Sequence, residues 1–200
     1  MDARIAVLAS GAGTNLQALL DDPHVGPSVV LVVSDRVAAF ALERARVHDV
    51  KAVVLLPAHY GSREGFDRAL RQLLEEEAIE FVLLAGFMRI LGPEVVGAYR
   101  EHILNVHPSL LPAFAGAHAV RDALAWGARV TGATVHLVDE ELDHGPIVVQ
   151  ETVEVSPEDD EASLHARIQE VEHRIYPRAA RWMIGGRLKV EGRRVHVLEA

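Results

Sequence analysis

The sequence predicts an α/β protein in which helices cover both faces of a mostly parallel sheet. Three observations support this class. Short apolar runs suit strands that are buried on both sides, and the segments between them carry apolar residues at helical spacing. The 200 residues, 50% of them hydrophobic, also allow one sizeable core. We find no internal repeat or linker, and therefore expect a single domain over residues 1–200.

The elements of the first half alternate between strand and helix. The apolar runs predict strands at Arg4–Ala9, Val29–Val33, Ala52–Leu56, Phe81–Phe87 and Ile103–Val106. Apolar residues three and four positions apart predict helices at Leu16–Leu20, Ala38–Val47 and Arg63–Glu77. This alternation is typical of β-α-β units, whose strands run parallel.

The second half is predicted to contain two strands, a long helix and a terminal hairpin. A loop at Asp139–Pro146 separates the two strands, and we expect Pro177 to bend the helix. The elements are the strands Thr131–Val138 and Ile147–Val155, the helix Ser163–Ile184, and the hairpin strands Leu188–Val190 and Arg194–Val197.

Composition excludes several classes of function. The formal net charge of −9 argues against general affinity for nucleic acid. The chain has no cysteine, which excludes disulfides, thiolate nucleophiles and zinc–thiolate sites. No apolar run approaches the roughly 20 residues of a membrane helix, and the N-terminus has no signal-peptide pattern. We therefore expect a cytoplasmic protein that contacts no membrane, while monomer and homodimer both remain open.

The most informative motif is Asn105-Val106-His107-Pro108-Ser109-Leu110-Leu111-Pro112. Asn105 and His107 are two residues apart on a predicted strand, so both side chains project from the same side. An amide that donates to a developing oxyanion, beside a base that moves a proton, suits acyl transfer. Asp143, in a downstream Gly-Pro loop, could orient and charge-stabilise the imidazole. An Asn-x-His pair alone is a weak indication of catalysis.

A glycine-rich turn, Ser10-Gly11-Ala12-Gly13-Thr14-Asn15, follows the first predicted strand. Such a turn exposes N–H groups at a helix N-terminus, where a phosphate fits. The dinucleotide fingerprint fails because position 16 is leucine, and the P-loop lysine is absent. On pattern alone, phosphate binding and a plain tight turn are equally supported.

The core motif, followed by Leu142-Asp143-His144-Gly145-Pro146, resembles the folate-dependent formyltransferases. From the first strand to the final helix, the chain is similar to the phosphoribosylglycinamide formyltransferase family. The resemblance implies a three-layer Rossmann-like fold. It also implies formyl transfer from the co-substrate 10-formyltetrahydrofolate to the amine of 5'-phosphoribosylglycinamide, in de novo purine (IMP) biosynthesis. Asn105, His107 and Asp143 would be catalytic, through direct amine attack, oxyanion stabilisation and assisted proton transfer.

The same resemblance implies two sets of binding residues. Gly13, Thr14 and Asn15 would hold the phosphate of the ribonucleotide. Gln169 and Glu172, in a Gln-x-x-Glu-His-x-x-Tyr-Pro pattern, would contact its ribose and glycinamide, although a solvated helix face is the ordinary alternative. The residues implied in folate binding are Arg63, Met88, Arg89, Ile90, Leu91, Asn105, Val138, Asp139, Glu140, Glu141 and Leu142. Without the resemblance, a plain strand terminus and a surface arginine explain this last set.

Histidines outside the core motif are expected to have ordinary roles. We expect solvated side chains at His24, His48, His59, His165 and His196. His118 and His136 lie in family-like segments, where packing or support of a neighbouring side chain is favoured over catalysis. No His-Glu-x-x-His pattern or spaced carboxylate cluster occurs, so we predict no metal. The chain departs from common family residues at His144, Ala113 and Ala115, which puts the detail of those loops in doubt.

Three alternatives remain against this prediction. Formyltetrahydrofolate hydrolase uses a similar triad with water as the acceptor, but it carries an extra N-terminal domain and a His-His-Ser-Phe-Leu core motif. Methionyl-tRNA formyltransferase requires a basic C-terminal domain, for which this chain has no room. A non-catalytic module that binds phosphoribosyl or folate ligands would need neither His107 nor Asp143.

Overall fold

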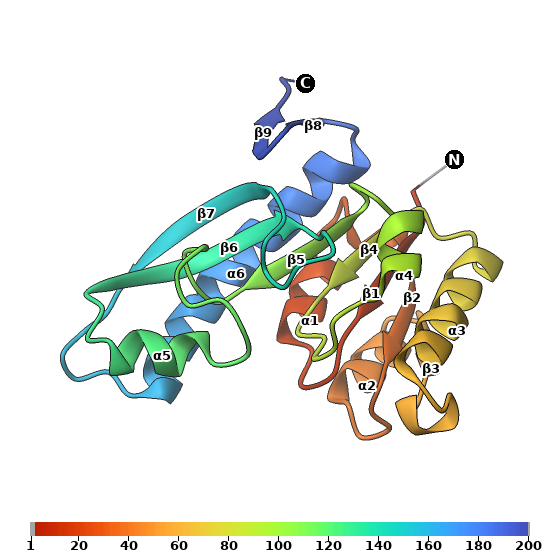
Figure 1. Cartoon of the computed structure of the whole chain (residues 1–200), viewed down its shortest axis with the longest axis horizontal. Coiled ribbons are helices and arrows are strands. Elements are labelled where there is room, and N and C mark those ends of the chain that lie inside the picture. Colours follow the sequence, from red (N-terminus) through yellow and green to blue (C-terminus); the bar gives the residue numbers. More distant parts are fainter. Residues whose placement is uncertain (1–2, 200) are drawn as a thin grey trace. The chain divides into compact units, whose positions relative to one another are not determined.

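A computed structural model describes residues 3–199 and contains two compact units, which divide between residues 104 and 105 (Figure 1). In the first unit, four parallel strands lie in the order β3-β2-β1-β4. These strands are β1 (Ile5–Leu8), β2 (Val29–Ser34), β3 (Lys51–Val54) and β4 (Phe81–Leu84). β1 is buried on both faces and has no exposed residue, as its continuous apolar run predicts.

Helices connect the strands of the first unit. The α-helices are α1 (Thr14–Leu20), α2 (Phe40–Val47), α3 (Arg63–Glu76) and α4 (Pro93–Ala98), and the 3-10 helices are η1 (Gly26–Ser28) and η2 (Pro57–His59). α2 packs on β2 and β3, while α3 packs against α4. The side chain of Ser62 caps α3 by accepting a hydrogen bond from the Gly65 amide at 3.1 Å.

β5 (Ile103–His107) leads into the second unit. The later elements are α5 (Ala119–Ala125), β6 (Val130–Leu137), β7 (Ile147–Glu154), α6 (Glu161–Ile184), β8 (Leu188–Glu191) and β9 (Arg194–Val197). β6 and β7 are antiparallel, β9 runs parallel to β7, and β8 and β9 form the predicted antiparallel hairpin. α6 packs on β6 and β7 and continues through Pro177.

The α/β class predicted from the sequence is confirmed, with three local differences. β4 ends at Leu84 rather than Phe87, because Gly86 turns the chain with φ = 73°. α1 begins at Thr14, two residues earlier than predicted. α4 and α5 were not predicted, since their six and seven residues are too short for a helical periodicity. Within residues 3–199, no helix is long and apolar enough to cross a membrane.

Candidate active site

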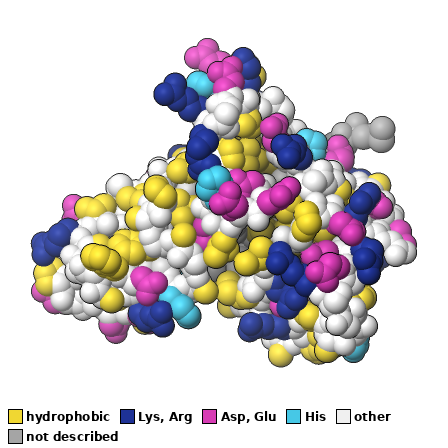
Figure 2. All heavy atoms as spheres, viewed as in Figure 1, with side chains coloured by type: hydrophobic (Ala, Val, Ile, Leu, Met, Phe, Trp, Pro, Cys, Tyr) yellow, Lys and Arg dark blue, Asp and Glu magenta, His cyan; other side chains and the backbone are white. Residues whose placement is uncertain are grey.

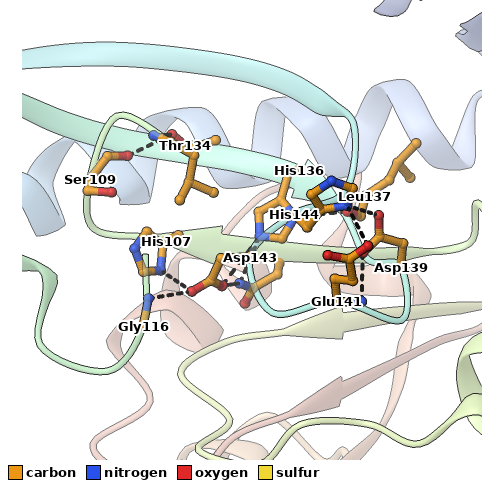
Figure 3. A network of polar contacts seen from close by, with 12 residues as sticks. His107, Ser109, Gly116, Thr134, His136, Leu137, Asp139, Glu141, Asp143 and His144 are labelled. Atoms are coloured by element: carbon orange, nitrogen blue, oxygen red, sulfur yellow. Dashed lines mark hydrogen bonds and ion pairs between the residues drawn. The ribbon is translucent and has the colours of Figure 1, made fainter. Parts of the chain in front are cut away.

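The second unit brings together Asn105, His107 and Asp143 (Figure 3). Asn105 and His107 lie on β5, and Asp143 lies in the loop between β6 and β7. Asp143 Oδ2 is 3.4 Å from His107 Nδ1, and the two side chains are only 7% and 6% exposed. Little water therefore screens the interaction between this carboxylate and the imidazole.

The second ring nitrogen of His107 also has an oxygen partner. Its Nε2 lies 2.9 Å from the carbonyl oxygen of Phe114, which can only accept a hydrogen bond, so Nε2 carries a hydrogen. Nδ1 faces a carboxylate oxygen. Each nitrogen therefore has an acceptor for a proton, which is the environment that favours a charged imidazole.

His136 determines the orientation of the Asn105 amide. His136 Nδ1 is 2.8 Å from the carbonyl oxygen of Leu137 and must donate to it, so Nε2 of the neutral ring is an acceptor. Asn105 Nδ2 donates to this Nε2 at 3.1 Å and approaches Asp143 Oδ1 at 3.5 Å. Burial lowers the pKa of His136, against the opposing effects of the Leu137 carbonyl and the Asp143 charge. The ring therefore stays neutral at pH 7.

A buried hydrogen-bond network holds the loop that follows His107. Thr134 Oγ1 donates to the carbonyl oxygen of Ser109 at 2.6 Å and accepts from the amide of Leu111 at 3.1 Å. Gln150 Nε2 donates to the Leu111 carbonyl and to Thr134 Oγ1, both at 2.9 Å. Ser109 and Thr134 are completely buried. β6 and β7 thus fix the loop through polar groups that are fully satisfied.

The backbone of Asp143 has a left-handed conformation. Its φ is 51°, which a residue with a side chain adopts only when its surroundings hold it there. The carboxylate is anchored by the Gly116 amide, which donates to Oδ2 at 2.8 Å (Figure 3). Nearby, a Cβ on Gly145 would lie 1.8 Å from the Leu137 carbonyl oxygen, so only glycine fits this position. The loop geometry therefore requires the Asp-x-Gly pattern of the sequence.

In the first unit, the glycine-rich turn precedes α1 as expected. Gly13 is the N-cap residue with φ = 72°, and a Cβ there would lie 2.8 Å from main-chain and side-chain atoms of Ala41. Arg44, on α2, donates to the Ala12 carbonyl at 2.9 Å. Thr14 and Asn15 begin the helix. The turn is thus a tight strand–helix connection whose shape requires glycine.

The segment Met88–Leu91 lies just beyond β4 and presents apolar side chains to solvent. Met88 and Ile90 are 61% and 51% exposed, whereas Leu91 is buried. Arg63 donates to the Leu91 carbonyl at 3.1 Å, and Arg89 stacks over the ring of Phe66, 4.8 Å from its centroid.

The buried carboxyl of Asp67 adjoins this segment. The Gly92 amide hydrogen-bonds to it, and Arg63 Nε is 3.9 Å from its Oδ2. Burial raises the pKa of Asp67, and both of these partners oppose the shift.

The remaining predicted binding residues lie on α6 and in the β6–β7 loop. On α6, Gln169 is partly buried, and Glu172 is 3% exposed. The burial of Glu172 contradicts the alternative of a solvated face. In the loop, Val138 and Asp139 are partly buried, whereas Glu140, Glu141 and Leu142 are exposed.

The other histidines lie as expected. The side chains predicted to be solvated are exposed at His24, His48, His59, His165 and His196. His118 is exposed as well, while His136 supports Asn105. The sequence gave no indication of the Phe114 and Gly116 backbone contacts, because they depend on loop conformation.

Charge and metal-ligand patterns limit the site further. Among the described residues, no group of three or more His, Cys, Asp or Glu side chains could hold a metal ion. On the face seen in Figure 2, Lys and Arg side chains lie among Asp and Glu side chains and form no continuous basic patch.

A family model described as formyl transferase matches residues 3–180. The chain belongs to the formyl transferase family. It is 43% identical over 189 residues to phosphoribosylglycinamide formyltransferase from Escherichia coli, which covers 93% of this chain and 89% of that protein. It is also 44% identical to the trifunctional purine biosynthetic protein adenosine-3 from Gallus gallus, over 94% of this chain but only 19% of that protein. The chain thus spans about a fifth of that larger relative.

The solved structures extend this similarity to the fold. Glycinamide ribonucleotide transformylase 1 from Symbiobacterium toebii superposes with a TM-score of 0.96 at 48% identity, over 99% of this chain and 95% of that one. The enzyme from Coxiella burnetii, solved in complex with CHES, gives a TM-score of 0.91 at 35% identity, over 98% and 94% of the two chains. The formyltransferase fold and the family resemblance predicted from the sequence are both confirmed.

Proposed function

We propose that this chain transfers the formyl group of 10-formyltetrahydrofolate to the amine of 5'-phosphoribosylglycinamide, a step of de novo purine synthesis. The buried Asn105–His107–Asp143 cluster carries the proposal, because it combines an amide donor, an imidazole and a carboxylate without any covalent nucleophile. Family membership supports the same reaction.

In the proposed mechanism, the neutral amine of the ribonucleotide attacks the formyl carbon directly. A tetrahedral intermediate forms, with negative charge on the former carbonyl oxygen and positive charge on the attacking nitrogen. The amide of Asn105 donates to this oxygen, using the N–H whose contact with Asp143 is long at 3.5 Å. His107 is the second donor, through Nε2, once that nitrogen exchanges the Phe114 carbonyl for substrate.

Collapse of the intermediate requires a proton to move from the attacking nitrogen to N10 of the folate. His107 carries this proton, directly or through a water molecule, and the nearby Asp143 carboxylate stabilises the charged ring. The C–N10 bond then breaks, leaving formylated amine and tetrahydrofolate. General acid–base assistance of this kind is commonly worth about 10²–10⁴ in rate.

Each binding role is assigned by matching positions within the family. Gly13, Thr14 and Asn15 offer backbone and side-chain donors to the phosphate, and Gln169 and Glu172 accept from the ribose hydroxyls or the ammonium group. The residues proposed to contact folate are Arg63, Met88, Arg89, Ile90, Leu91, Asn105, Val138, Asp139, Glu140, Glu141 and Leu142. The exposed apolar side chains of Met88, Ile90 and Leu142 suit a flat heteroaromatic ligand.

We further propose that residues 1–200 act as one catalytic domain in the cytoplasm, as a monomer or homodimer that binds neither nucleic acid nor metal. The charge of −9 favours small-molecule substrates held by local donors over a nucleic-acid partner.

The test mixes purified protein with 10-formyltetrahydrofolate, with and without 5'-phosphoribosylglycinamide, and follows deformylated folate by absorbance. We expect turnover only with the amine, together with formylated ribonucleotide in equal amount. Equal rates with and without the amine would instead establish hydrolysis. Binding of both ligands without turnover under either condition would indicate a non-catalytic module.

A further inference from the structure

An arginine of the terminal hairpin contacts the loop that carries Asp143. Arg193 lies in the turn between β8 and β9, and β9 pairs with β7 at Arg194 and Ile147. This pairing places the turn beside residues 139–145. Arg193 Nη2 donates to the carbonyl oxygen of His144 at 2.6 Å, and its Nη1 is 3.1 Å from His144 Nε2. Both contacts involve the residue next to Asp143.

The contact continues through the loop as a chain of hydrogen bonds. A guanidinium group only donates, so His144 Nε2 is an acceptor and Nδ1 carries the hydrogen. Nδ1 then donates to Asp139 Oδ2 at 2.7 Å (Figure 3). The other oxygen of Asp139 accepts from the Glu141 amide at 3.0 Å. The line from Arg193 through His144 to Asp139 therefore ties both ends of the loop to the hairpin.

This support matters because the intervening backbone is strained. Asp143 is held at φ = 51°, and Gly145 packs directly against the Leu137 carbonyl. A residue with a side chain keeps such a conformation only where neighbouring contacts enforce it. The Arg193 bond fixes the His144 carbonyl and thereby the peptide that follows Asp143. Without this bond, the loop has one constraint fewer on the side facing the hairpin.

We propose that Arg193 is a positioning residue, which holds the His144 carbonyl and so keeps the Asp143 carboxylate against His107. This inference rests on the proposed role of Asp143 in formyl transfer. Arg193 does not touch the reacting atoms, and it acts through the backbone of the loop. Because its own side chain is exposed, replacing it should leave the core of the unit undisturbed.

The test compares Arg193→Met, which keeps the length of the chain but removes its donors, with Arg193→Lys, which retains one positive donor. Arg194→Met is the matched control, since no hydrogen bond or ion pair within the described residues involves the Arg194 side chain. We expect Arg193→Met to lower kcat by about three- to tenfold, since small displacements of a catalytic group are costly while exposed contacts are individually weak. KM for the ribonucleotide should stay unchanged, Arg193→Lys should recover part of the loss, and Arg194→Met should match wild type.

A second measurement needs no turnover. The Gly116 amide donates to Asp143 Oδ2 at 2.8 Å, so its hydrogen exchange reports whether that carboxylate stays in place. Exchange should accelerate in Arg193→Met and remain as in wild type in Arg194→Met. Equal kcat and equal exchange in the two variants would overturn the positioning role. If wild type transfers no formyl group but Gly116 exchange still responds to Arg193→Met, the proposed function fails while the positioning of Asp143 stands.

Discussion

Replacing Asp143 with asparagine removes one negative charge and changes little else in the structure. The new side chain can keep an oxygen towards the Gly116 amide, where the present distance is 2.8 Å. Its nitrogen would then face His136 Nε2, which is 3.8 Å from Oδ1 and is an acceptor. We therefore expect the variant to fold and to bind both substrates almost as wild type does.

The expected loss of turnover follows from the distance between the two charged groups. A carboxylate 3.4 Å from a protonated imidazole contributes about 5 kcal/mol at an effective dielectric constant of about 20. The asparagine dipole and remaining water would replace about half of this. The net loss of about 2–3 kcal/mol corresponds to a roughly 30- to 150-fold lower kcat.

The assay follows steady-state formyl transfer, with ligand titrations and thermal unfolding of the same preparations. Asp122→Asn on α5 is the control, because it makes the same chemical change at an exposed carboxylate that pairs with Arg121. It should be indistinguishable from wild type. A folded Asp143→Asn variant with near wild-type kcat would refute the proposed stabilisation of the imidazolium, and a loss confined to folate affinity would move Asp143 to the binding residues.

Three other changes test separate parts of the molecule. Gly13→Ala should weaken ribonucleotide binding more than folate binding in calorimetric titrations, because φ is 72° and the new Cβ would lie 2.8 Å from α2; equal losses would place the phosphate elsewhere. The lowered pKa of His136 predicts stability that is complete above about pH 6.5 and declines as the pH falls towards that pKa. His136→Gln should flatten this decline in urea unfolding at pH 7.5 and 5.5, and an unchanged slope would contradict the assignment. Gly92→Ala should destabilise the fold by about 1–3 kcal/mol, since its Cβ would lie 2.0 Å from Asp67, whereas Gly97→Ala has open space and should not.

The predictable part of the fold came from residues that repeat with a period. Buried strands such as β1 and β2 are continuous apolar runs, and the amphipathic α3 and α6 are long enough to show a helical pattern. The short α4 carries too few residues for such a pattern. The end of β4 depends on a single left-handed glycine, Gly86, which no periodicity reveals.

The candidate site was predictable where it follows the chain locally. The spacing of Asn105 and His107 places both on one side of β5, and the Asp143 loop was identified from its Gly-Pro pattern. The contacts made by Phe114 and Arg193 join segments that are distant from their partners or depend on loop conformation. Composition and spacing contain no record of such contacts, so only three-dimensional coordinates reveal them.

The tautomer of His136 has a further consequence for Asn105. A main-chain carbonyl, that of Leu137, decides which nitrogen of the ring carries hydrogen, and the ring then decides which way the amide faces. Turning the amide over would place its oxygen against two acceptors, His136 Nε2 and the Asp143 carboxylate. The donor is therefore oriented when the chain folds, and no rotational freedom remains to be lost when a substrate arrives. Selection on the geometry of this amide acts in part on the backbone register of β6, where a side-chain comparison would not detect it.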